Sequence, residues 1–124
     1  MVRKTLPLWS AVLFAVSLTA GAQSMPAMKA ADGTMTDAKG MTLYTFDRDA
    51  GDKSACNGPC ATNWPPLMAT GDAKASGDWT IVTRDDGTKQ WAFKGKPLYT
   101  WSKDGKAGDK TGDNVNNVWH VAKD

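Results

Sequence analysis

The stretch Gly40-Met41-Thr42-Leu43-Tyr44-Thr45-Phe46 returns as Gly95-Lys96-Pro97-Leu98-Tyr99-Thr100-Trp101 after a shift of 55 positions, from 40 to 95. Leu-Tyr-Thr followed by an aromatic residue is too specific to recur in register by chance, so the chain contains an internal repeat. Each copy is too small to bury its own apolar face. The sequence therefore predicts two copies of one β-rich unit, at about residues 29–67 and 83–121, packed around a pseudo-twofold axis.

The register continues on both sides of the repeated stretch. Upstream, Asp32-Gly33-Thr34 matches Asp86-Gly87-Thr88 with a shift of 54, which is one residue of insertion. Downstream, the shift of 55 aligns one aspartate and one tryptophan of each copy: Asp49 with Asp104 and Trp64 with Trp119.

Each unit is predicted to contain three to four short strands. In the second copy, Trp79–Arg84 and Lys89–Phe93 are rich in β-formers and flank an Asp-Gly turn. Leu98–Trp101 and Val118–Val121 are expected to add two more strands. The first copy opens on weaker strand sequences, around residues 28–30 and 35–36. All thirteen acidic residues are Asp, which favours turns over helix interiors, so the fold class is mainly β.

The N-terminus has the pattern of a secretory signal peptide. Arg3 and Lys4 precede the apolar run Leu6–Ala20, and Ala20-Gly21-Ala22 supplies a small-residue cleavage site. We expect residues 1–22 to be the signal peptide and residues 23–124 to form a single domain of two repeats. The run is too short for a membrane span, and no cysteine near the cleavage site could carry a lipid anchor. The predicted location is the periplasm or the exterior.

The charge balance argues against a nucleic-acid partner. Without Arg3 and Lys4, the mature chain has 13 basic residues against 13 aspartates. Nucleic-acid binding requires a clustered basic footprint, which a neutral chain of this kind lacks.

The repeated motif resembles one bacterial family. The relevant segments are Leu43–Asp49, Ser54–Ala61, Trp64–Leu67 and Gly95–Asp104, which together extend over nearly all of the mature chain. They resemble the secreted repeat of unknown function, also described as predicted lipoproteins with a Tyr-x-(Phe/Trp/Tyr)-x-x-Asp motif. The motif occurs twice, as Tyr44-Phe46-Asp49 and as Tyr99-Trp101-Asp104. The resemblance implies no settled biochemical activity, and the missing lipobox cysteine favours release over anchoring.

Cys56 and Cys60 are the only cysteines, and an even pair in an exported protein predicts a disulfide. The loop is short and would stabilise the fold by roughly 2 kcal/mol. Two alternatives stay open, a redox-active pair and a metal-binding pair, although the C-x-x-x-C spacing lacks the geometry of a C-x-x-C motif.

Two roles are possible for the repeated aromatic residues. Alternation along a strand places Tyr44 with Phe46, and Tyr99 with Trp101, on common faces. These side chains could fill the core, or they could form an exposed platform for a flat or sugar-like ligand. The same question applies to Trp64 and Trp119, which are expected to be structural or to lie on a ligand face.

The aspartates that close the motif, Asp49 and Asp104, are most simply turn formers or caps. Asp47, Asp49 and Asp52 could also collect a hard cation such as Ca²⁺, although they lack the full pattern of an EF-hand loop.

A copper site is a further alternative. Thioethers can bind Cu(I), and four methionines precede or begin the first motif: Met25, Met28, Met35 and Met41. His120 is the sole imidazole and is expected to be exposed on the face opposite Trp119. No motif supplies a nucleophile for it to activate.

The function predicted from the sequence is a non-enzymatic binding or interaction module without a cofactor. Its partner would be a protein or a small ligand that binds the repeated aromatic–Asp face. The alternative is a periplasmic redox or copper-handling protein that uses Cys56 and Cys60 with a methionine or His120.

Overall fold

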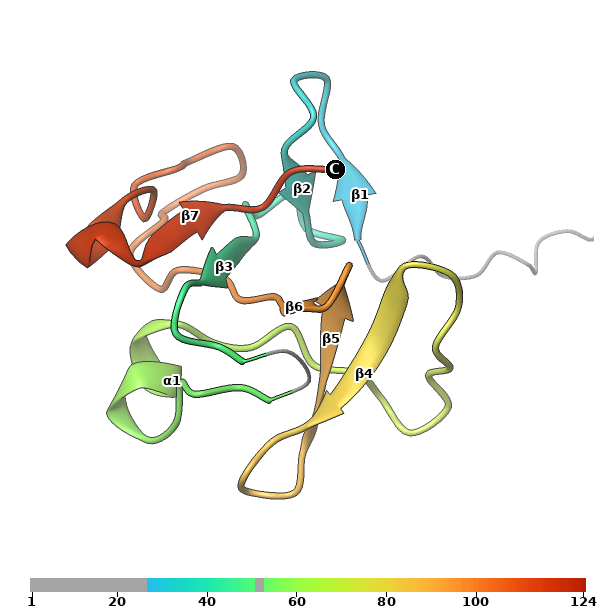
Figure 1. The fold of residues 1–124 in the computed structure, drawn as a ribbon. Helices are drawn as coiled ribbons and strands as arrows, with labels where there is room; N and C mark the ends of the chain where they lie inside the picture. Colours follow the sequence, from blue (N-terminus) through green and yellow to red (C-terminus); the bar gives the residue numbers. More distant parts are fainter. Residues whose placement is uncertain (1–26, 51–52) are drawn as a thin grey trace, which may run out of the picture.

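The structure is a computed structural model that describes residues 27–50 and 53–124. The predicted signal peptide, Met25 and Asp52 lie outside the described residues. The elements follow the chain in this order (Figure 1): β1 (Met28–Lys29), β2 (Met35–Thr36), β3 (Tyr44–Phe46), α1 (Pro59–Asn63), β4 (Trp79–Thr83), β5 (Lys89–Phe93), β6 (Lys96–Pro97), a 3-10 helix (Val115–Asn117) and β7 (Trp119–Val121).

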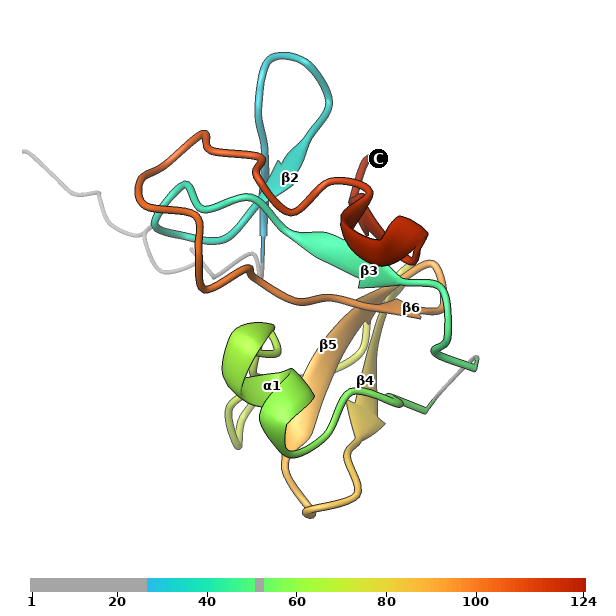
Figure 2. The ribbon, with the colours of Figure 1, turned by 90° about the vertical axis from the view of Figure 1, so that its left-hand side faces the viewer.

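The strands form three small antiparallel sheets, which confirms a mainly β fold. β1 pairs with β2, β3 pairs with β7, and β4, β5 and β6 follow one another in a three-stranded sheet. The β3–β7 pair joins the two copies, with Phe46 opposite Trp119 and Tyr44 opposite Val121. Figure 1 shows this pair above the three-stranded sheet, and Figure 2 shows β6 next to β3.

The hairpins that open the two copies use the same turn. The backbone N–H of Thr34 donates to the Asp32 carboxylate over 3.0 Å, and Thr88 donates to Asp86 over the same distance. Gly33 and its counterpart Gly87 have φ angles of 87° and 88°, which glycine adopts without strain. The Asp-Gly-Thr sequence therefore specifies the turn in each copy.

The weak strand sequences at the start of the first copy do form strands, although each has only two residues. Their support is tertiary, because the Met35 N–H donates to the carbonyl of Ala122 over 2.9 Å, and the Leu43 N–H donates to the carbonyl of Met35 over 2.9 Å. Pairing on both sides of Met35 outweighs its modest intrinsic β-propensity.

Backbone hydrogen bonds related by the 55-residue shift confirm the pseudo-twofold arrangement. At the axis, Tyr44 and Tyr99 exchange N–H···O=C bonds of 2.7 and 3.0 Å. Away from it, Ala122 donates to Leu43 over 2.8 Å, and the equivalent residue Leu67 donates to Leu98 over 2.9 Å.

The third strand predicted in the second copy is displaced. The ladder is at Lys96–Pro97 instead of Leu98–Trp101. Tyr99 forms single bridges with Tyr44 on one side and with Pro66 on the other. The consecutive N–H groups of Leu98, Tyr99 and Thr100 donate to three different segments, at Trp91, Tyr44 and Pro65, so no continuous ladder with one partner forms.

Two cores lie on opposite sides of the repeated stretch. Leu43 and Leu98 are buried in one apolar cluster with Met35 and Ala122. The next residues, Tyr44 and Tyr99, are completely buried in a second cluster that contains Trp64, Trp119 and Cys56. Alternation along an extended chain sends consecutive side chains to opposite faces, so Leu-Tyr supplies one residue to each core.

Gly112 is expected to tolerate no side chain. A Cβ at this position would lie 2.8 Å from Cη2 of Trp64 and 3.0 Å from Cγ of Trp101. Overpacking of this kind costs about 1–3 kcal/mol, so Gly112→Ala should lower the free energy of unfolding by that amount in urea titrations. Gly71→Ala is the matched control, because nothing lies within 4 Å of its Cβ position. Equal stabilities of the two variants would contradict this packing.

Candidate functional site

The two copies of the Tyr-x-aromatic-x-x-Asp motif exchange hydrogen bonds. The Tyr44 hydroxyl donates to Oδ2 of Asp104 over 2.7 Å, and the Tyr99 hydroxyl donates to Oδ2 of Asp49 over 2.7 Å. Each tyrosine therefore bonds the aspartate of the other copy.

The aspartates also have the predicted turn role. The Asp49 N–H donates to the carbonyl of Phe46, and the Asp104 N–H donates to that of Trp101. Their Oδ1 atoms accept backbone N–H groups from the loops that follow, from Ala55 over 2.7 Å and from Thr111 over 2.9 Å.

Burial sets the protonation of these groups. The pKa of Tyr44 is raised well above its usual value of about 10. The main cause is removal of the hydroxyl from water, and the hydrogen bond to Asp104 is the second cause. Burial likewise raises the pKa of Tyr99, with a further contribution from Asp49. Burial also raises the pKa of Asp49, against the opposing hydrogen bonds from Ala55 and Tyr99. Both tyrosines are therefore neutral donors at physiological pH.

A buried arginine, which sequence reasoning missed, joins the hydrogen-bond network that contains Tyr99 and Asp49. Arg84 is only 4% exposed and donates to Oγ of Ser54 and Oε1 of Gln90, each over 2.9 Å. Its second terminal nitrogen donates to the carbonyl of Cys56 over 2.6 Å. Ser54 Oγ lies 2.5 Å from the Tyr99 hydroxyl, so the network is continuous from the arginine to Asp49.

Four aromatic rings form a stack across the two copies. The centroid separations are 3.8 Å from Trp101 to Trp64, 3.8 Å from Trp64 to Trp119, and 4.1 Å from Trp119 to Phe46. The 55-residue shift relates the two central rings, Trp64 and Trp119, to each other. It relates the two outer rings, Phe46 and Trp101, in the same way. Tyr44 and Tyr99 contact the central indoles edge-on, at 5.4 and 5.1 Å.

The stack decides between the two roles considered for the repeated aromatic residues: they fill the core, and the motif does not form the exposed aromatic–Asp face suggested as a binding surface. Trp64 and Trp119 are buried, and the motif tyrosines are completely buried. The reason is that each copy uses the aromatic residues of the other to cover its own. Phe46 and Trp101, at the ends of the stack, are half-buried.

The predicted disulfide between Cys56 and Cys60 is confirmed, with a Cα–Cα distance of 5.2 Å. It lies at the start of α1, where Pro59 occupies the first turn. The Trp64 N–H donates to the Cys60 carbonyl over 2.8 Å, so the disulfide helps to place this indole. In this form both sulfur atoms are engaged with each other, and the structure gives no support to the redox or metal alternative.

Two of the predicted calcium ligands, Asp47 and Asp49, bond different partners, and the third, Asp52, lies outside the described residues. The Asp47 carboxylate lies 2.7 Å from Nε2 of His120, while that of Asp49 bonds Tyr99 and Ala55. Within the described ranges, no group of three or more His, Cys, Asp or Glu residues could hold a metal ion. The candidate copper ligands also differ in environment, since Met28 is exposed and Met35 is buried.

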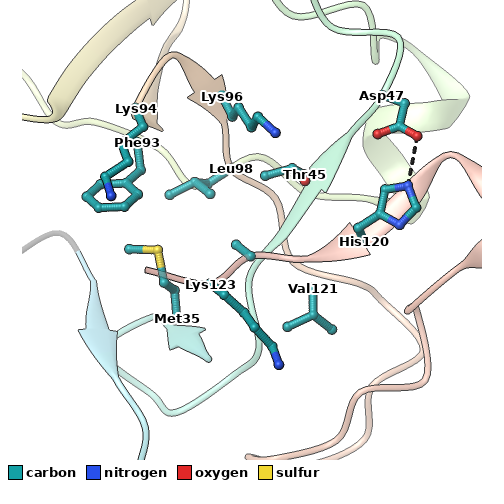
Figure 3. A pocket seen from close by; sticks show the side chains of 11 residues that line it. Met35, Thr45, Asp47, Phe93, Lys94, Lys96, Leu98, His120, Val121 and Lys123 are labelled. Atoms are coloured by element: carbon teal, nitrogen blue, oxygen red, sulfur yellow. Dashed lines mark hydrogen bonds and ion pairs between the residues drawn. The ribbon is translucent and has the colours of Figure 1, made fainter. Parts of the chain in front are cut away.

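His120 is half-buried at the edge of a pocket of about 380 Å³. Met35, Leu98 and Ala122 are buried core residues that form its floor. Figure 3 shows Met35 facing Leu98 and Phe93 across the space, with the Asp47–His120 pair at one end. Both copies contribute to the pocket. The first copy supplies residues of β2 and β3, and the second supplies residues of β5, β6 and β7 and of the turn between β5 and β6.

Three lysines surround this apolar floor: Lys94, Lys96 and Lys123. Lys94 Nζ lies 5.2 Å from the centre of the Phe93 ring and 3.6 Å from the Asp124 carboxylate. Among the described residues, no carboxylate forms an ion pair with Lys96 or Lys123. We call this space the cationic pocket.

The internal repeat supplies a comparison for the cationic pocket. At the positions related by the 55-residue shift, the other copy has Met41 for Lys96, Pro65 for His120, Met68 for Lys123 and Ser102 for Asp47. The backbone bonds of Ala122 and Leu67 show that this correspondence holds in three dimensions. The charged groups are therefore not required by the shared fold. Sequence reasoning named Asp47 and His120 only as candidate metal ligands and missed the lysines, because these residues are separated along the chain, but divergence between the copies was a usable signal.

The sequence model of one family, the secreted repeat of unknown function, matches residues 27–68 and 80–123. The chain belongs to this family. The two matched segments agree with the two predicted copies to within three residues at each end. The secreted repeat is an exported protein, periplasmic or released, and in the part of the chain that the structure describes no helix has the length and apolarity needed to cross a membrane. No curated protein and no solved structure matches this secreted repeat.

Proposed function

We propose that this secreted repeat is a non-enzymatic binding module that takes a small anion with an apolar body in its cationic pocket. The observation that carries the proposal is the pair of lysines, Lys96 and Lys123, over a floor of buried apolar side chains. Pockets of a few hundred Å³ with an apolar lining and a few convergent polar groups are the usual form of small-ligand sites.

The charges suit the two parts of such a ligand. Its apolar body would contact Met35 and Leu98, which line the floor. Its acidic group would meet the ammonium groups of Lys96 and Lys123. The His120–Asp47 pair holds the imidazole at the rim, where it can add a hydrogen bond to the bound anion.

The test uses two fluorescent probes that differ by one charge. Anilinonaphthalene sulfonate carries the acidic group, and N-phenyl-naphthylamine has the same rings without it. The double variant Lys96→Met/Lys123→Met introduces the residues that the other copy has at these places, so the fold should tolerate it. Two partly exposed ion pairs contribute about 1–1.5 kcal/mol together, so sulfonate affinity should fall about tenfold. The affinity for the neutral probe should not change.

Lys74→Met is the matched control, because Lys74 is exposed and does not line the pocket. It should leave both affinities unchanged. Urea unfolding of each variant checks that the fold is intact. Equal sulfonate affinity of the wild type and the double variant would contradict the proposed function.

A further inference from the structure

We propose that a second site on this protein, an aromatic groove, binds a carbohydrate through one of its sugar rings, with a preference for an acidic sugar. The groove has a volume of about 390 Å³ and shares no lining residue with the cationic pocket. Its wall is aromatic, formed by Phe46, Trp64 and Trp119, and its rim is polar, formed by Arg48, Asn63 and Asn116.

The aromatic wall suits the apolar face of a sugar. Phe46 lies parallel to Trp119, with an angle of 12° between the rings, and it ends the four-ring stack. Its half-buried ring borders the groove together with the indoles. Trp64 and Trp119 are covered on both faces by other rings and border the groove only with their edges, so the C–H face of a pyranose would pack on the Phe46 ring at the end of the stack.

The polar rim suits the hydroxyl groups. Asn63, Asn116 and Arg48 are exposed, and no side-chain hydrogen bond or ion pair joins them to another residue in the described ranges. An amide side chain both donates and accepts, as sugar hydroxyls do. A guanidinium only donates and binds carboxylates in a bidentate fashion, which accounts for the preference for an acidic sugar.

Both sides of the groove are ordered without a ligand. On one side, the disulfide and α1 place Asn63 and Trp64. On the other, Asn114, Asn116 and Asn117 have φ angles of 66°, 52° and 60°, a left-handed conformation that asparagine adopts more readily than most residues. A loop fixed in this way loses little conformational entropy when a ligand binds.

The test is a titration with two trisaccharides, neutral cellotriose and acidic trigalacturonate, followed by ¹H–¹⁵N NMR of the intact protein. We expect shifts at the side-chain amides of Asn63 and Asn116 and at the indole N–H groups of Trp64 and Trp119. The dissociation constant should be about 1 mM or lower, and trigalacturonate should bind more tightly than cellotriose.

Two substitutions separate the parts of the groove. Asn116→Gly removes the amide and keeps the left-handed backbone conformation, which alanine would strain, and it should weaken binding of both sugars about fivefold. Arg48→Gln should remove only the preference for trigalacturonate. Lys103→Gln is the matched control, because Lys103 corresponds to Arg48 in the other copy and does not line the groove.

Three outcomes would overturn the site: no shifts with either sugar at about 10 mM, shifts confined to the residues of the cationic pocket, or unchanged affinity in Asn116→Gly. Since the probes and residues differ from those of the cationic pocket, the result is independent of the proposed function. Urea unfolding of the variants excludes a loss of binding through a loss of fold.

Discussion

Replacement of Trp64 by alanine should reduce the free energy of unfolding by about 3–5 kcal/mol, a large part of the stability of a domain this size. Trp64 is 4% exposed and contacts three rings, those of Trp101, Trp119 and Tyr44. Its removal leaves a cavity between the two copies and exposes the inner face of the stack. Urea unfolding monitored by circular dichroism measures the loss, and Trp64→Phe provides a milder variant if the alanine variant does not fold.

Trp79→Ala is the comparison for this effect. Trp79 is half-buried and packs against Trp91 and Phe93 on the three-stranded sheet, away from the stack. Trp79→Ala should reduce the free energy of unfolding clearly less than Trp64→Ala does. If the two variants lost the same stability, the stack would not be the main contact between the copies.

Raising the pH above about 10 should unfold the protein steeply, with both tyrosines ionising in the same transition. Tyr44 and Tyr99 are the only tyrosines in the chain, and burial raises the pKa of each well above 10. Between the ordinary pKa and the raised one, the folded state holds two protons that the unfolded state has released. Stability therefore falls with rising pH in this window, by about 2.7 kcal/mol per pH unit for two groups.

Absorbance at the tyrosinate band and circular dichroism, recorded on the same samples, provide the measurement. The two signals should change together. The protein unfolded in urea is the control, and its tyrosines should titrate near pH 10. Tyrosinate absorbance that rises near pH 10 while the circular dichroism stays native would contradict the buried tyrosine–aspartate bonds.

Much of the fold could be predicted from local sequence. The repeated Leu-Tyr-Thr-aromatic stretch identified two copies, and Asp86-Gly87-Thr88 located the hairpin between β4 and β5. The cysteine pair predicted the disulfide. These features depend on neighbouring residues, on turn chemistry and on the alternation of faces, so a single sequence contains them.

The contacts between the copies could not be predicted in the same way. The Tyr44 hydroxyl bonds Asp104, which is 60 residues away, and not Asp49 of its own motif. The repeat identifies two equivalent tyrosine–aspartate pairs, but nothing in the local sequence indicates that the two copies exchange partners. The burial of Arg84 has no local signal either, because an arginine beside a turn is usually exposed.

The exchange of tyrosine–aspartate bonds also sets an order of events for a chain that leaves the cell with its N-terminus first. Tyr44 has no partner for its hydroxyl until Asp104 has crossed, 60 residues later. The first copy therefore has nothing to close upon while the second is still inside, and native contacts at such long sequence separation form late. A chain that emerges from its N-terminus therefore cannot complete the tyrosine–aspartate contacts until nearly all of it has crossed.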